Sequence, residues 1–113
     1  MSIDRLNATQ VEACMTSLSQ WTCNYSDSNI FKEWRFDSFK TAIAMLVRVS
    51  ELAESHNHHP EMMSAYTLVR IKLWTHDAQG LTGKDFELAK AIDKLVAQEF
   101  PQATSAWFKK PRF

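Results

Sequence analysis

The segment DSFKTAIAMLVRVSELAESHNHHP, residues 37–60, decides the fold because it carries the most regular apolar pattern in the chain. Asp37 or Ser38 can cap a helix there, and the pattern predicts that this helix continues to about Ser55. Pro60 disfavours helix at the residue before it, so the chain becomes extended at that point. The apolar stripe of the predicted helix comprises Phe39, Ala42, Ile43, Leu46, Val49 and Ala53.

Strand patterns lie on both sides of this helix. After it, Met62 to Tyr66 and Val69 to Thr75 predict two strands that can pair as a hairpin. Before it, Trp21 to Tyr25 and Ile30 to Phe36 predict two more, separated by a polar turn at residues 26–29. In the last strand of the four, apolar and polar positions alternate, which is typical of a strand with one buried face; the apolar positions are Val69, Ile71 and Leu73.

Two further helices complete the predicted fold. The first runs from Ala8 to Gln20 after Asn7, and the last begins at Thr82, with Asp85 completing a capping box, and ends before Pro101. The predicted order is therefore α-β-β-α-β-β-α. This order favours the α+β class, with a four-stranded antiparallel sheet and three helices packed on one face. A length of 113 residues suits a single domain, residues 1–113.

Composition excludes several classes of function. The formal net charge is zero, so no strong field would attract nucleic acid or anionic lipid. No apolar stretch approaches the roughly 20 residues of a membrane span, and the N-terminus does not resemble a signal peptide. Two cysteines, Cys14 and Cys23, are fewer than a disulfide-stapled secreted domain usually carries. We therefore expect a cytoplasmic protein that binds neither nucleic acid nor membrane.

Histidines gather where the predicted hairpin opens. His58 and His59 precede the third strand, and His76 ends the fourth. If these strands are antiparallel neighbours, Pro60 and Thr75 lie at the same end of the sheet. The three imidazoles would then lie close together, beside the C-terminus of the long helix.

Clustered imidazoles are suited to moving protons. An unperturbed histidine has a pKa of about 6.5 and can hold or release a proton under cell conditions. Glu54 and Asp85 are candidate carboxylates to support a charged imidazole. The histidines could instead be solvated loop residues or ligands of zinc, copper or iron, although adjacent His58 and His59 would point to opposite sides of an extended backbone.

Three aromatic residues could belong either to a binding site or to the core. Trp34, Tyr66 and Trp74 could stack on a flat heterocycle. An aromatic residue on a sheet more often belongs to a core or an interface.

A family signature links these positions: an acidic residue, His-His-Pro after a gap of three, an aromatic residue, a further histidine and an aspartate. On these residues, and on the flanking stretches IFKEWRFDSFKTAIAML and RIKLWTHDAQGLTGKDFELAKAID, the chain resembles the pterin-4a-carbinolamine dehydratases over roughly residues 20–96. The matching residues are Glu54, His58, His59, Pro60, Tyr66, His76 and Asp85.

The resemblance implies a reaction and a site. The family removes water from 4a-hydroxytetrahydrobiopterin to give quinonoid dihydrobiopterin in tetrahydrobiopterin recycling, with no metal or organic cofactor. It implies that His58, His59 and His76 are catalytic; we expect His59 or His76 to be the acid and His58 the base. Glu54 and Asp85 would support them. The residues implied to bind the pterin substrate are His58, His59, Pro60, Thr75, His76, Asp77 and Ala78.

The resemblance also implies partners. Family members form homodimers or homotetramers and serve aromatic amino-acid hydroxylases, and animal members also bind a homeodomain transcription factor. An interaction module is therefore the alternative function, with a surface on the long helix. One departure from the family is Met62, where tryptophan is common; this change could loosen packing beside the pocket or alter a subunit contact. The expected interaction surface includes Lys40, Met45, Arg48 and Glu51.

Overall fold

The computed structural model describes residues 4–105. Burial alternates along its two central strands, β2 (Asn29–Arg35) and β4 (Leu68–Leu73). From Ile30 in β2 and from Val69 in β4, every second side chain is buried and the intervening positions are half-buried; Asn29 and Leu68, the first residues of the two strands, are also buried. This pattern confirms that one face of the sheet is covered and the other is open. The side chains on the covered face are Ile30, Lys32 and Trp34 of β2 and Val69, Ile71 and Leu73 of β4.

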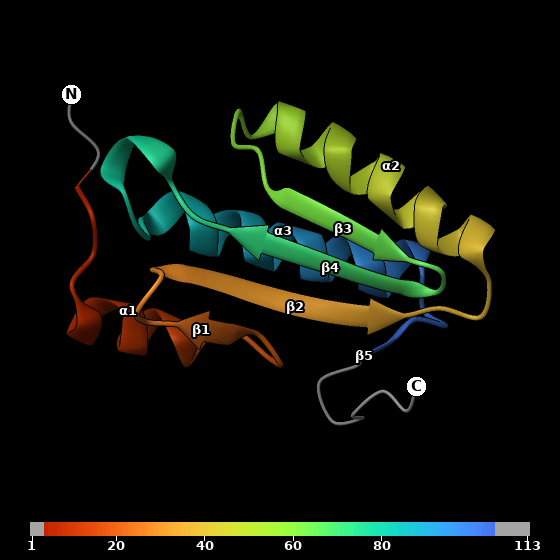
Figure 1. Cartoon of the computed structure of the whole chain (residues 1–113), viewed down its shortest axis with the longest axis horizontal. Helices are drawn as coiled ribbons and strands as arrows, with labels where there is room; N and C mark the ends of the chain where they lie inside the picture. Colours follow the sequence, from red (N-terminus) through yellow and green to blue (C-terminus); the bar gives the residue numbers. More distant parts are fainter. Residues whose placement is uncertain (1–3, 106–113) are drawn as a thin grey trace.

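The strands form one antiparallel sheet in the order β1-β2-β4-β3 (Figure 1). The outer strands are β1 (Thr22–Asn24) and β3 (Glu61–Ala65). All four predicted strands are present, with bounds within one or two residues of the predicted ones. A further two-residue strand, β5 (Thr104–Ser105), pairs with β2 and was not predicted.

Three helices cover one face of this sheet, as predicted. The longest are α2 (Phe39–Ser55) and α3 (Gly83–Glu99), and α3 passes behind the strands in Figure 1. Ser38 caps α2, and the predicted capping box at the start of α3 is present. None of the helices among residues 4–105 is both long enough and apolar enough to cross a membrane.

The first helix, α1 (Ala8–Met15), is shorter than predicted. Its capping box is present, but the predicted extension to Gln20 is wrong. Thr16 and Ser17 donate hydrogen bonds from their hydroxyls to carbonyls one turn back, and this competes with continued helix.

The buried face of α2 also differs from the predicted stripe. Met45, expected on the exposed side, is fully buried, so that expectation is wrong. Phe39, expected in the stripe, is 52% exposed. The helix is rotated so that its innermost line follows spacings of three and four residues. That line consists of Ala42, Met45, Val49 and Ala53.

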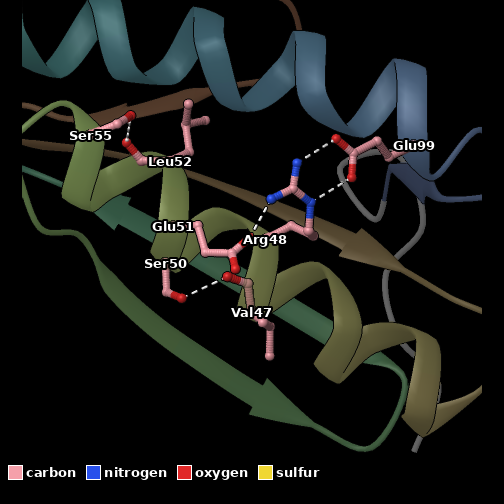
Figure 2. A network of polar contacts seen from close by, with 7 residues as sticks. All are labelled: Val47, Arg48, Ser50, Glu51, Leu52, Ser55 and Glu99. Carbon is pink, nitrogen blue, oxygen red and sulfur yellow. Dashed lines mark hydrogen bonds and ion pairs between the residues drawn. The ribbon is translucent and has the colours of Figure 1, made fainter.

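An arginine joins the two long helices at the surface (Figure 2). Arg48 of α2 donates from Nε and Nη2 to the two carboxylate oxygens of Glu99 in α3, at 2.7 and 2.8 Å. It also contacts Glu51 on its own helix. The hydrogen bonds from Arg48 lower the pKa of the Glu99 carboxyl below its ordinary value.

This lowered pKa predicts how stability depends on pH. Because the folded-state pKa of Glu99 lies below the unfolded value, its contribution is present above the unfolded pKa and is lost as pH falls through the folded pKa. Glu99→Gln should therefore lower the free energy of unfolding at neutral pH, and the difference from wild type should shrink in acid. Urea unfolding at several pH values measures it. Glu87→Gln, an exposed position on the same helix, is the control, and an equal loss there would contradict the prediction.

Candidate active site

Three segments of the chain meet at the open end of the β3–β4 hairpin. The register pairs Ala65 with Leu68 at the turn and Glu61 with Lys72 toward the open end. The turn after α2 and the short helix η1 (His76–Ala78) after β4 therefore lie together, next to the start of α3. They enclose an open cavity of about 300 Å³. Its lining residues are Asn57, His58, His59, Thr75, His76, Asp77 and Lys84.

His58 is buried against a carboxylate. Its Nε2 lies 2.6 Å from Oδ1 of Asp85, whose side chain is 0% exposed. The other carboxylate oxygen, Oδ2, accepts hydrogen bonds from Thr75 Oγ1 at 2.8 Å and from the Thr82 amide at 2.9 Å. A buried carboxylate with three hydrogen-bonding partners is well satisfied, so the imidazole is held in one orientation.

His59 forms a second histidine–carboxylate pair, in a different environment. Its Nε2 is hydrogen-bonded to Glu54 Oε2 near the end of α2. The side chains of His59 and Glu54 are 62% and 74% exposed. The site therefore contains one buried imidazole and one solvent-exposed imidazole, each with its own carboxylate.

His76 begins η1 and packs against an aromatic ring. Its ring centroid lies 4.7 Å from that of Trp74, with the planes tilted by 52°. The loop is closed where the Thr75 amide donates to the Gly80 carbonyl at 2.8 Å. A Cβ at Gly80 would lie 2.6 Å from Nε of Arg5, so glycine lets the N-terminal segment pass close to this loop.

Several residues that the sequence singled out do not line the cavity. Pro60 and Ala78 do not line it. Tyr66 is exposed at the turn of the hairpin, the opposite end from the histidines. Trp34 is buried and packs edge-on against Trp21, so it belongs to the core.

Sequence reasoning missed three residues at the site. Asn57 lines the cavity in the left-handed region with φ of 50°, a conformation that asparagine tolerates after a helix end. Lys84 lines it from the first turn of α3, and the hydroxyl of Thr82 contacts Thr75. The position of Asn57 just after a predicted helix could have indicated it. No sequence signal indicates Lys84 and Thr82, because only the tertiary fold brings them close to the histidines.

Metal ligands were the other interpretation of the clustered histidines. Within residues 4–105, no group of three or more histidine, cysteine, aspartate or glutamate side chains is arranged to hold a metal ion.

Comparison with known proteins agrees with this fold. The family model described as pterin 4 alpha carbinolamine dehydratase matches residues 4–95. The chain therefore belongs to this family, a class of α+β proteins that the order of its helices and strands also fits.

Particular relatives support this membership. A protein of Rhizobium johnstonii, provisionally named a pterin-4-alpha-carbinolamine dehydratase, is 44% identical over 98 residues, 87% of this chain and 97% of its own. A protein of Prochlorococcus marinus with the same provisional name is 40% identical over 84% of this chain and 97% of its own. The crystal structure of a transcriptional coactivator/pterin dehydratase from Brucella melitensis has a TM-score of 0.77 and 27% identity, and covers 81% of this chain and 98% of its own.

The contrast between the two histidine–carboxylate pairs predicts different effects on stability. His58→Ala leaves a buried carboxylate without its imidazole and should cost about 3–5 kcal/mol. His59→Ala breaks an exposed pair and should change stability by less than about 1 kcal/mol. Denaturant unfolding of both variants at neutral pH compares them. Equal costs would contradict the view that burial distinguishes the two pairs.

Proposed function

We propose that this protein is a 4a-hydroxytetrahydrobiopterin dehydratase, a hydro-lyase that forms quinonoid dihydrobiopterin and water. The observation that carries the proposal is the cavity lined by His58, His59 and His76, in which two of the three imidazoles have carboxylate partners. The family membership favours the same activity. Titratable side chains in a pocket that can hold a small molecule are typical of proton-transfer sites.

The reaction requires two proton transfers at neighbouring ring atoms. The C4a–O bond breaks and the hydroxyl leaves as water after taking a proton from a general acid. A double bond forms between C4a and N5 while a general base removes the N5 proton. Positioned acids and bases contribute roughly 10²–10⁴-fold each to such steps.

We assign His58 as the base and His59 or His76 as the acid. A base becomes positively charged when it accepts a proton, and the Asp85 carboxylate at 2.6 Å would stabilise that charge in a site with little water. Glu54 is proposed to support His59 through the hydrogen bond to its Nε2. Thr75 and Asp77, which line the cavity, are proposed to contact the pterin, and so are Pro60 and Ala78, which follow lining residues in the sequence.

The proposed chemistry uses no cofactor, since it transfers protons only and the pterin is the substrate. A resident metal is the competing explanation for the histidines. Metal analysis of the purified protein, and unfolding with and without a chelator, tests this point directly.

Self-association is proposed through the exposed side of α2. Phe39 and Val47 are each 52% exposed, and Ile43 lies between them at a spacing of four residues. Met62, on the outer strand β3, is 38% exposed. A homodimer or homotetramer would bury these apolar side chains.

The two free thiols among residues 4–105, Cys14 and Cys23, fit the cytoplasmic location that this pathway implies. A hydroxylase in the same compartment would supply the substrate.

Val47→Glu places a charge on the proposed contact surface and should shift the protein toward smaller species at equal concentration. Sedimentation velocity measures the shift. Glu87→Gln, on the exposed side of α3, is the control. An unchanged sedimentation profile for Val47→Glu would place the contact elsewhere.

The dehydratase activity is tested by generating 4a-hydroxytetrahydrobiopterin with a hydroxylase and following quinonoid dihydrobiopterin by absorbance. Wild type should accelerate the reaction, and His59→Ala, His76→Ala and His58→Gln should each lose activity, at least one of them by roughly 10²-fold. Glutamine is used at His58 because its amide N–H can still donate to Asp85.

His56→Ala is the matched control for this experiment. His56 is the C-cap of α2 and does not line the cavity, so its loss should leave the rate close to that of wild type. No acceleration by wild type over the spontaneous reaction would rule out the proposed activity.

A further inference from the structure

The hydrogen bonds around Asp85 have a fixed direction, which can be worked out donor by donor. Backbone N–H groups only donate. The Thr82 amide therefore gives its proton to Asp85 Oδ2 at 2.9 Å, and the Lys84 amide gives its proton to Thr82 Oγ1 at 3.3 Å. Asp85 Oδ2 and Thr82 Oγ1 are therefore the acceptors in these two hydrogen bonds.

The two threonine hydroxyls complete the chain of donors. Thr75 Oγ1 donates to Asp85 Oδ2 at 2.8 Å, which uses the only proton of that hydroxyl. Thr75 Oγ1 also lies 2.8 Å from Thr82 Oγ1, so in that contact Thr82 must be the donor. The chain therefore runs in one direction, from Lys84 N through Thr82 Oγ1 and Thr75 Oγ1 to Asp85 Oδ2.

Burial protects the direction of these hydrogen bonds, because water has little access to the groups that form them. Thr75, Thr82, Asp85 and His58 are all buried. Water that could exchange with these contacts at a surface is largely excluded, and an unsatisfied group would carry its full desolvation cost. With Oδ2 occupied by two donors, Asp85 presents Oδ1 to His58 as a further acceptor.

We propose that this chain makes Thr82 and Thr75 positioning residues for His58, holding its proton on Nε2 and presenting Nδ1 to the cavity. The inference rests on the proposed dehydratase function and specifies it, because it names the nitrogen that accepts the substrate proton. In the proposed arrangement Asp85 is a carboxylate, so its Oδ1 accepts at 2.6 Å and the proton lies on Nε2. In the neutral imidazole the lone pair is then on Nδ1.

The proposal predicts that His58 adopts the opposite tautomer in Asp85→Asn. The donors from Thr75 and Thr82 would hold the amide oxygen of the new side chain, so its NH₂ group would face His58 Nε2. His58 would then accept at Nε2 and carry its proton on Nδ1. The variant should fold and lose activity, as expected when a base carries its proton on the wrong nitrogen.

Nitrogen-15 NMR of histidine side chains tests the proposal without an activity assay. His58 signals are assigned by their loss in His58→Gln. Neutral His58 in wild type should have a protonated Nε2 and a bare Nδ1, and Asp85→Asn should exchange the two. A proton on Nδ1 in wild type, or an unchanged Nε2–H in Asp85→Asn, would overturn the proposal.

Kinetics test the two threonines. Thr75→Val removes one donor from the carboxylate and should lower kcat by about 10-fold. Thr82→Val should lower kcat by less, because it acts through Thr75. Thr75→Ser and Thr82→Ser keep the hydroxyls and should restore most of the lost kcat. Failure of the serine variants to restore kcat, with all folds intact by circular dichroism, would contradict the positioning role.

The dehydratase activity and the proton position on His58 can be disproved separately. If NMR gives the expected proton positions while wild type does not accelerate the reaction, the dehydratase function fails and the arrangement of His58 stands. If wild type is active but His58 carries its proton on Nδ1, the function stands and the positioning role fails.

Discussion

The carboxylate of Asp85 is the constraint on which both the fold and the site depend. It accepts the Thr82 amide at the start of α3, the Thr75 hydroxyl at the end of β4, and a contact from His58 after α2. With 0% exposure it has no water to replace any of these partners. The same two oxygens therefore begin a helix, join it to the sheet and orient an imidazole.

Most of the fold is predictable because its signals are local. Alternation at Val69, Ile71 and Leu73 indicates a half-buried strand whatever lies against it, and each capping box indicates a helix start within four residues. Burial on α2 is less predictable, since Phe39 and Met45 are both apolar and only packing decides which one is inside. The strand Thr104–Ser105 has too few residues to produce a pattern.

The part of the candidate site that the β3–β4 hairpin forms was predictable from the sequence. Pairing of β3 with β4 is enough to bring His76 to His58 and His59. The choice of carboxylate for each histidine was not predictable, because Asp85 comes from a helix that follows the hairpin. Thr82 and Lys84 were missed for the same reason, since no short-range pattern relates a helix cap to a distant imidazole.

The unequal exposure of the two histidine–carboxylate pairs has a consequence for the protein in different salt conditions. Dissolved ions screen charges over about 8 Å at physiological ionic strength, and they do so where water has access. The exposed pair of His59 and Glu54 lies within reach of such ions, whereas His58 and Asp85 lie behind protein atoms. Ionic strength should therefore act more strongly on the His59–Glu54 pair than on the His58–Asp85 pair, so burial gives two imidazoles that are adjacent in sequence different responses to salt.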